Sequence, residues 1–383
     1  MSRAAACLCL LAGLAAAQAA DSWKAVYNRG AEALERGEPR EAAAEFEKAL
    51  GLAPGNAGVL HGLMTAELAA GRIGAALEAS GKLLTRLREG GGDFALSMAA
   101  AQALAAHGQL AGAAEFYKLA QQHAPAAIDG RPSAVYFDNL FAALFAQMKQ
   151  GGEAVARLER LAAAEPQEPA HVYQLGLMLI QTARFGRAYD TMQRGVERFP
   201  ASFEVQLAYA LSCYFSGRNE QAEAAYRRLT EMRPASAQPY FALGNFYADT
   251  GRDSEAAAAF ARAVKLEPGQ FLNQYMYGVE LYRTQKIAPA EASLRRAVEL
   301  NPGHADSHYW LGKVYLAEDR AARALGEFEE AVKLEPKHIG AYYQLALLYQ
   351  RRGEKEKARE ALRRRGELMQ QLHQGIVAER MTQ

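Results

Sequence analysis

Three residues in the C-terminal part of the chain could hold a divalent metal ion. His304, Asp306 and His308 place two imidazoles four positions apart with a carboxylate between them, and residues at this spacing share one face of a helix. Imidazole nitrogens and carboxylate oxygens are common zinc ligands, so one reading is a metal-dependent enzyme. Because His304 comes just after Pro302, where a turn is expected, the alternative is that the three residues pack and cap a helix.

A catalytic nucleophile is harder to find. Cys213 is the only one of the three cysteines outside the first twenty residues, so no internal disulfide is expected once that segment is removed. No histidine or acidic residue lies close in sequence to activate its thiol, and a small buried hydrophobic residue is the simpler interpretation. P-loop, GxSxG, HExxH and dinucleotide-binding motifs are absent. We expect a protein without enzymatic activity and without a cofactor.

The N-terminus is typical of an export signal. Arg3 supplies a positive charge, an apolar run extends from Ala4 to Ala17, and Ala17-Gln18-Ala19 offers the small residues that a signal peptidase requires. Residues 1–20 are therefore predicted to be a signal peptide. The mature chain would be exported to the bacterial envelope, as a periplasmic or secreted protein. A retained anchor is the alternative, although the run is shorter than the ~20 residues that span a bilayer.

The charge balance argues against partners recruited by a long-range field. The 44 basic and 43 acidic side chains nearly cancel, so nucleic acid is not expected as a partner and membrane contact is at most peripheral. The basic segment 351–365 interleaves Glu354, Glu356 and Glu360 with its cations. Such alternation favours a solvated face crossed by ion pairs, with an acidic partner or anionic lipid as the alternative.

A fixed spacing of prolines organises most of the chain. Six prolines follow one another at intervals of 34 residues, namely Pro166, Pro200, Pro234, Pro268, Pro302 and Pro336. A period of this size indicates stacked supersecondary units. Extending the frame backwards requires small phase slips around residues 89–93 and 126–133. It then gives ten units, which start near residues 23, 57, 94, 135, 169, 203, 237, 271, 305 and 339.

The unit from Ala237 shows the clearest motif, which consists of Tyr240, Leu243, Gly244, Tyr247, Gly251, Ala256, Phe260, Ala263 and Pro268. This pattern resembles the tetratricopeptide repeat. The resemblance implies an all-α fold, a right-handed α-solenoid of about ten antiparallel helix pairs over residues 21–365. Residues 366–383, with Leu368, Leu372 and Ile376 one turn apart, are expected to form a capping helix.

Glycines at two repeat positions have separate mechanical roles. Gly or Ala at the eighth position, as in Gly244, lets the two helices of a pair approach closely. Gly at the fifteenth position, as in Gly251, marks the turn between them, where the chain needs a left-handed conformation. Ala183, Gln285 and Asp319 depart from this turn glycine.

In the family that the chain resembles, positions 2, 5, 9, 12 and 13 of the first helices line a concave groove. The resemblance therefore implies a peptide-binding groove formed by Tyr173, Leu177, Leu207, Leu211, Tyr214, Phe241, Asn245, Tyr275, Tyr282, Tyr309, Lys313 and Tyr343. Apolar and aromatic side chains that repeat in this way are suited to binding another protein. The alternative is that the rings pack on the next repeat and tighten the stack.

The sequence thus favours a protein-binding scaffold or adaptor of the cell envelope that holds polypeptide segments in its groove. Relatives that grip a C-terminal carboxylate use Lys at position 5 and Asn at position 9, and only Asn245 is present here, so such a clamp is not expected. Two other functions remain open. One is a self-associating structural component, and the other is the metal-dependent enzyme based on His304, Asp306 and His308.

Overall fold

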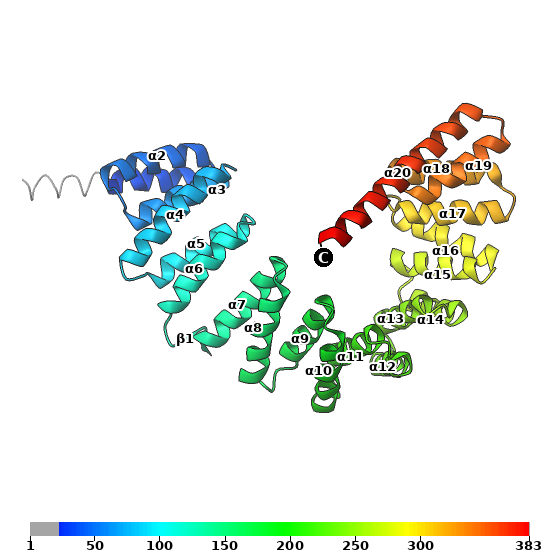
Figure 1. Cartoon of the computed structure of the whole chain (residues 1–383), viewed down its shortest axis with the longest axis horizontal. Helices are drawn as coiled ribbons and strands as arrows, with labels where there is room; N and C mark the ends of the chain where they lie inside the picture. Colours follow the sequence, from blue (N-terminus) through cyan, green and yellow to red (C-terminus); the bar gives the residue numbers. More distant parts are fainter. Residues whose placement is uncertain (1–22, 383) are drawn as a thin grey trace, which may run out of the picture. The chain divides into compact units, whose positions relative to one another are not determined.

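The computed structural model describes residues 23–382, and it describes side chains as far as residue 374. The predicted signal peptide, residues 1–20, lies outside this range. The described residues are almost entirely helical, and the helices follow one another in ten pairs (Figure 1). Within residues 23–382, no helix combines the length and the apolar character needed to cross a membrane. The predicted all-α solenoid is confirmed.

Contacts divide the chain into two compact units, the first ending at Thr191 and the second beginning at Met192. The boundary falls within α10 (Phe185–Arg198). The first unit starts with a helix over residues 23–35. It continues with α2 (Pro39–Leu52), α3 (Ala57–Ala69), α4 (Ile73–Glu89), α5 (Phe94–Ala106), α6 (Leu110–Gln122), β1 (Ala127–Ile128), β2 (Arg131–Pro132), α7 (Ser133–Gln147), α8 (Gly151–Ala164) and α9 (Pro169–Gln181).

The second unit is built from five further pairs. These are α11 (Phe203–Phe215) with α12 (Asn219–Met232), α13 (Ala237–Asp249) with α14 (Asp253–Leu266), α15 (Phe271–Arg283) with α16 (Ile287–Leu300), α17 (Ala305–Ala317) with α18 (Ala321–Leu334), and α19 (Ile339–Arg351) with α20 (Lys355–Thr382). Each helix contacts its partner and the next helix along the chain, and α15 also contacts α17. Packing between neighbours in sequence is what defines a solenoid.

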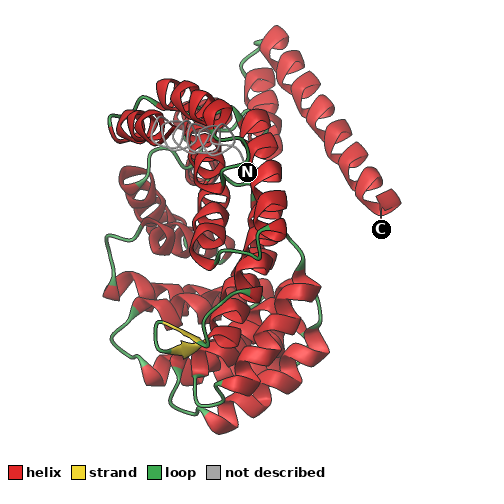
Figure 2. Ribbon diagram, turned by 90° about the vertical axis from the view of Figure 1, so that its left-hand side faces the viewer, coloured by secondary structure: helices red, strands yellow, loops and turns green. Residues whose placement is uncertain are grey.

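The helix starts follow the period read from the sequence. First helices begin at Ala57, Phe94, Pro169, Phe203, Ala237, Phe271, Ala305 and Ile339, the residues at which repeats were expected to start. The start expected near residue 135 is at Ser133. Both phase slips have a structural cause. Helix α4 has 17 residues where α2 has 14, and the hairpin β1–β2 lies between α6 and α7 (yellow in Figure 2).

The short hairpin follows from local turn chemistry. Its central residues, Asp129 and Gly130, have φ angles of 50° and 78°, and an Asp-Gly pair is a favoured centre for a tight turn of this hand. Only two residue pairs are in register, Ala127 with Pro132 and Ile128 with Arg131. The hairpin is therefore an insertion between repeats and does not change the all-α architecture.

The turns within repeats adopt the expected left-handed conformation. Gly251 has a φ of 73°, and its neighbour Arg252 donates its backbone N–H to the carbonyl of Tyr247 at 2.8 Å, as in a Schellman motif. Ala183 and Gln285, which replace the turn glycine, also have positive φ angles, 55° and 60°. A non-glycine residue costs about 1–2 kcal/mol in this conformation. The repeat geometry therefore imposes the turn even where glycine is absent.

The expected capping helix is not a separate element. α20 runs without a break from Lys355 to Thr382, so the segment from residue 366 continues the second helix of the last repeat (red in Figure 1). Leu368 is buried, but Leu362, Met369 and Leu372 are 48%, 46% and 52% exposed. The helix therefore leaves part of its apolar surface uncovered by the described residues.

Three helix pairs of the second unit, α13–α14, α15–α16 and α17–α18, close on a large buried side chain of their second helix. A Cβ atom added to Gly244 in α13 would lie 2.6 Å from a ring carbon of Phe260 in α14, and Phe260 is fully buried. The same arrangement places Gly312 against Phe328. In these pairs the direct contact explains glycine at the eighth position, as expected from the sequence, while Ala210 and Ala346 occupy the same position in two other repeats.

Gly244→Ala should destabilise the protein by about 1–3 kcal/mol, because the new methyl group meets a buried ring that has no room to move. The matched control is Gly326→Ala in α18, where an added Cβ meets no atom within 4 Å. Alanine there should stabilise by about 0.5–1 kcal/mol through helix propensity. Urea unfolding followed by circular dichroism measures both. Equal effects of the two substitutions would contradict the packing described here.

Candidate functional site

The expected groove residues of the second unit lie on its first helices, α11, α13, α15, α17 and α19. At the fifth position, Leu207, Phe241, Tyr275 and Tyr309 are half-buried. Tyr343, in the last repeat, is 42% exposed. This set is therefore neither a fully buried core nor a fully solvated surface.

Two of the fifth-position rings pack on the cap of the next first helix. The ring centroid of Tyr275 lies 4.8 Å from that of His304, and the Tyr309 centroid lies 4.7 Å from that of His338. Each histidine caps its helix, since Nδ1 of His304 accepts the N–H of Ser307 at 3.2 Å and His338 does the same for the following repeat. These rings therefore join one repeat to the next, and this role is compatible with binding at their free edges.

An aromatic cluster spans α15 and α17. The centroids of Tyr282 and Trp310 are 5.6 Å apart in an edge-to-face arrangement, and Tyr309 is also 5.6 Å from Trp310. The ammonium of Lys313 lies 5.5 Å from the Tyr282 centroid, within the range of a cation–π contact. Burial raises the pKa of Tyr275 to about 12. Burial also raises the pKa of Tyr309, so the phenols of Tyr275 and Tyr309 keep their protons at neutral pH.

The other expected positions are more scattered. On α11, Leu207 and Leu211 are half-buried, and the Tyr214 ring lies 6.1 Å from that of Phe246 in an edge-to-face contact. Asn245 on α13 is half-buried. These residues flank the aromatic cluster on preceding repeats of the same unit.

Two of the expected groove residues belong to the first unit. Tyr173 and Leu177 lie on α9 and are half-buried. Leu177 lines a hollow of about 280 Å³ together with Asn139, Gln174 and Gln181. Both residues therefore belong to the first unit.

The residues proposed as metal ligands do not converge. Each has a separate partner: His304 caps α17, Asp306 accepts from His338 at 3.1 Å, and His308 contacts Glu327 through Nδ1 at 2.7 Å and the carbonyl of Pro302 through Nε2 at 2.9 Å. Within residues 23–382, no group of three or more potential ligands could hold a metal ion. The packing and capping interpretation accounts for all three.

Cys213 is fully buried in α11. Burial raises the pKa of its thiol, and a thiol with a raised pKa is a poor nucleophile at neutral pH. The structural role expected from the sequence agrees with this position.

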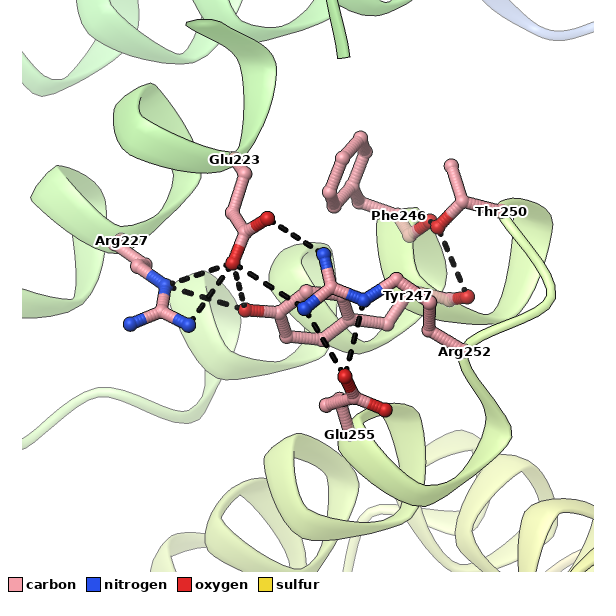
Figure 3. A network of polar contacts seen from close by, with 7 residues as sticks. All are labelled: Glu223, Arg227, Phe246, Tyr247, Thr250, Arg252 and Glu255. Atoms are coloured by element: carbon pink, nitrogen blue, oxygen red, sulfur yellow. Dashed lines mark hydrogen bonds and ion pairs between the residues drawn. The ribbon is translucent and has the colours of Figure 1, made fainter. Parts of the chain in front are cut away.

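The sequence reasoning missed a polar network between repeats. Glu223 in α12 accepts hydrogen bonds from Arg252 and, at 3.0 Å, from the hydroxyl of Tyr247, while the Arg252 guanidinium lies 4.4 Å from the Tyr247 ring centroid (Figure 3). Arg227 donates to the Tyr247 hydroxyl at 3.2 Å. The bond from Arg252 holds the pKa of Glu223 below its usual value. The network ties α12 to the following pair.

Related contacts recur two repeats later. Glu291 accepts from Arg320 at 2.8 Å, and Arg320 lies 4.3 Å from the Tyr315 ring centroid. The spacing of 68 residues between the two sets is visible in the sequence. A search at twice the repeat period could have found it.

Several basic residues of the C-terminal segment form ion pairs, among them Arg352, Lys357, Arg363 and Arg364. Lys357 contacts Glu354 at 2.8 Å, and Arg363 contacts Glu360 at 2.6 Å. The segment 351–365 still holds eight basic residues against three acidic ones, so an acidic partner or anionic lipid stays an open alternative.

Comparisons with protein families agree with the repeat geometry. Two tetratricopeptide repeat families match residues 207–271 and 33–85. The family described as anaphase-promoting complex, cyclosome, subunit 3 matches residues 283–365. The helix pairs at these residues have the length, turn and period of that repeat. The chain contains tetratricopeptide repeats.

Several solved structures are similar to the chain at low identity. MamA from Desulfovibrio magneticus is 22% identical over 44% of this chain and 96% of its own, with a TM-score of 0.41. A tetratricopeptide repeat protein fragment from Cytophaga hutchinsonii is 16% identical over 60% and 94%, with a TM-score of 0.49. The Cut9–Hcn1 assembly is 14% identical over 90% and 87%, with a TM-score of 0.42. No curated protein matches the chain.

Tetratricopeptide repeats are typically scaffolds rather than enzymes, and none of the matched families is catalytic. We take the half-buried side chains on the first helices as the candidate functional site. We call Tyr275, Tyr282, Tyr309, Trp310 and Lys313 the aromatic face.

The contact of His308 with Glu327 should make stability depend on pH. Its hydrogen bond to Glu327 raises the pKa of His308, so the folded state binds the proton more tightly than the unfolded state. The stabilisation by protonated His308 is complete below the pKa of the imidazole in the unfolded state, about 6.5. It is lost as pH rises through the higher pKa of the imidazole in the folded state. Glu327→Gln should therefore cost about 1 kcal/mol at low pH and less at high pH.

Denaturant unfolding of wild type and Glu327→Gln measures the difference in their free energies of unfolding. Measurements at about pH 5.5 and about pH 8.5 lie on either side of the histidine reference pKa. A stability gap that stayed constant over the range would show that the protonated imidazole contributes nothing.

Proposed function

We propose that this chain is a scaffold or adaptor that holds a polypeptide segment of another protein on the first helices of its second unit. Tetratricopeptide repeat proteins generally mediate contacts between proteins. The observation that carries the proposal is the row of apolar and aromatic side chains on successive first helices, half-buried at Phe241, Tyr275 and Tyr309 and exposed at Tyr343. Side chains of this kind are enriched at the centres of protein interfaces.

The charges of this surface favour apolar anchoring over recognition of a carboxylate. The fifth position carries no lysine in any repeat of the second unit. Lys313 is the cation of the aromatic face, and it lies over the Tyr282 ring. Amide side chains such as Asn245 and Gln350 would meet the backbone of a bound segment.

We further propose that the protein acts in the bacterial envelope, as a periplasmic or secreted protein whose first ~20 residues are removed on export. The support is the sequence of residues 1–20 alone. Cys213 is the one cysteine that would remain after removal of this segment, so the exported chain would have no internal disulfide.

The test is chemical cross-linking and affinity capture of the tagged chain from its own cells, followed by mass spectrometry. The groove variant combines two substitutions at expected groove residues, Tyr282→Ala and Tyr343→Ala. The matched control, Tyr240→Ala with Tyr349→Ala, removes two tyrosines of the same unit that lie elsewhere: Tyr240 donates to the Pro234 carbonyl, and Tyr349 to Glu329. Wild type and control should capture the same partner. The groove variant should capture at least about tenfold less of it.

A partner retained equally by all three proteins would place binding elsewhere. A partner that proves to be a second copy of the chain would favour self-association instead. The intact mass of the captured chain tests the proposed export, because a processed chain lacks its first ~20 residues and an unprocessed chain retains them.

A further inference from the structure

The last repeat of the second unit ends in an apolar surface that the described residues leave open. This repeat consists of α19 and α20 (Figure 1). Five of its large hydrophobic side chains are between 37% and 52% exposed, namely Tyr343 and Leu347 on α19 and Leu362, Met369 and Leu372 on α20. We call these five residues the terminal face.

The preceding repeats show what covers the equivalent surface inside the array. Tyr309 at the fifth position contacts Phe328 at the twenty-fourth, with ring centroids 5.8 Å apart. Tyr343 and Leu362 hold these two positions in the last repeat. Phe328 is fully buried, whereas Leu362 is 48% exposed. In the preceding repeats the first helix of the next repeat packs against the second helix, so the open surface is one that a helix normally covers.

The terminal face is more apolar than the mere end of an array requires. Met369 stands at the thirty-first position, where the four preceding repeats have Arg233, Glu267, Asn301 and Glu335. Leu372 stands at the thirty-fourth position, where they have Ser236, Gln270, His304 and His338. A terminal repeat usually has a polar outer face, and an exposed apolar patch marks a site of interaction. These substitutions favour a surface that a partner covers.

The charge beside the terminal face is reversed relative to the contacts inside the array. In two preceding repeats the twenty-first residue is a glutamate that accepts from an arginine of the next repeat, Glu223 from Arg252 (Figure 3) and Glu291 from Arg320. The equivalent residue of the last repeat is Arg359, which is exposed. A carboxylate on the covering helix would form the same pair with its charges exchanged.

Cations without ion pairs lie along the apolar side of α20. Lys355, Arg359 and Leu362 follow one another at spacings of four and three residues, so they share one side of the helix. Lys355 and Arg359 are exposed, and neither has an ion-pair partner among the described residues. Glu360 lies on the opposite side of the helix and pairs with Arg363. Unpaired positive charge is therefore concentrated beside the terminal face.

A third cation adds to this charge. Arg365 stands at the twenty-seventh position, where the preceding repeats have the fully buried residues Leu229, Ala263, Ala297 and Ala331. Its guanidinium lies 4.9 Å from the ring centroid of Tyr343. Two copies that met through their terminal faces would bring these cations together, and like-charge repulsion disfavours such a dimer. An acidic partner would pair with them.

We propose that the terminal face binds an amphipathic helix of a partner protein that carries acidic residues beside its apolar stripe. The helix takes the place that the first helix of a further repeat would take. Its apolar side covers Leu362 and Met369, and its carboxylates pair with Lys355 and Arg359. This site uses other helices than the aromatic face on α15 and α17, so it goes beyond the proposed function.

The test uses the full chain and three dye-labelled synthetic peptides of about 18 residues, a length at which an amphipathic helix can form. The acidic peptide has leucine along one helical side and glutamate on both flanks. The basic peptide has lysine in place of each glutamate, and the scrambled peptide keeps the acidic composition without the leucine spacing. In fluorescence anisotropy titrations, the acidic peptide should bind at least about tenfold more tightly than either of the others.

Charge reversal locates the site. Arg359→Glu should weaken binding of the acidic peptide by about tenfold and strengthen binding of the basic peptide. The matched control is Arg363→Glu, which changes the net charge equally on the side of the helix that faces Glu360. It should leave both affinities within about twofold of wild type. Met369→Gln should also weaken the acidic peptide, because it removes exposed apolar area. Circular dichroism confirms that each variant is folded.

Two peptide results would overturn the proposal. One is an acidic peptide that binds no better than the basic and scrambled peptides. The other is an acidic peptide that binds wild type and Arg359→Glu equally. Tyr282→Ala, in the aromatic face, should leave binding of the acidic peptide unchanged. The proposed function is tested separately, because its cross-linked partner depends on Tyr282 and this peptide depends on Arg359.

Sedimentation velocity and vesicle flotation test the other occupants. We expect wild type to remain monomeric over a concentration series. We also expect no Met369-dependent binding to vesicles of equal parts phosphatidylglycerol and phosphatidylcholine. A dimer that Met369→Gln abolishes would make a second copy the occupant, and vesicle binding that Met369→Gln abolishes would make it an anionic membrane. Either result would contradict the partner helix.

Discussion

The structure depends on the close approach of two helices at a residue without a side chain. In the pair α13–α14, the fully buried ring of Phe260 fills the space that a Cβ on Gly244 would occupy. Phe328 and Gly312 repeat this contact in α17–α18. A pair closed in this way still has an apolar side that it cannot cover, and the next pair covers it. The repeat is therefore stable only in an array.

The same constraint explains why side chains of the first helices are only partly buried. The second helices supply the large side chains that fill the pairs, such as Phe260 and Leu294, both fully buried. The first helices keep their fifth-position residues at the edge of the packing, where Tyr275 and Tyr309 contact the histidine caps of the following repeats. Such rings are held in place by the fold, so a partner would meet a surface with little conformational freedom left to lose.

Much of this architecture could be predicted from the sequence because it depends on local rules. The 34-residue period places the helix starts, and the left-handed turn at Gly251 follows from its position in the repeat. Even Ala183 adopts the turn conformation expected for glycine. These features are set by backbone sterics and helix-stop chemistry within one repeat.

The features that the sequence reasoning missed depend on pairings between repeats or on local exceptions to the period. The bond from Arg252 to Glu223 joins residues 29 positions apart, and a search for single-repeat motifs does not reveal it. Glu280 is fully buried at a position where neighbouring repeats have Phe246 and Val314, and burial raises its pKa. The tail predicted as a separate cap continues α20, because no proline interrupts it and Gly366, at the predicted boundary, stays within the helix.

The site itself could be predicted only in part. The family pattern selected the half-buried rings of Tyr275, Tyr282 and Tyr309, but not Trp310, which adjoins two of them. Trp310 occupies the sixth position of its repeat, outside the positions taken from the family. Its role depends on the contact between α15 and α17, and a list of repeat positions does not contain that contact.

Hydrogen exchange of wild type and Gly312→Ala, followed by mass spectrometry, tests the central claim most directly. If each pair is stabilised mainly by its neighbours, the substitution should speed exchange in α17 and α18, less so in α15, α16, α19 and α20, and leave α2 to α6 unchanged. A loss of protection that was uniform over all described helices would contradict the account. It would show one cooperative globule instead of an array held together by contacts between neighbours.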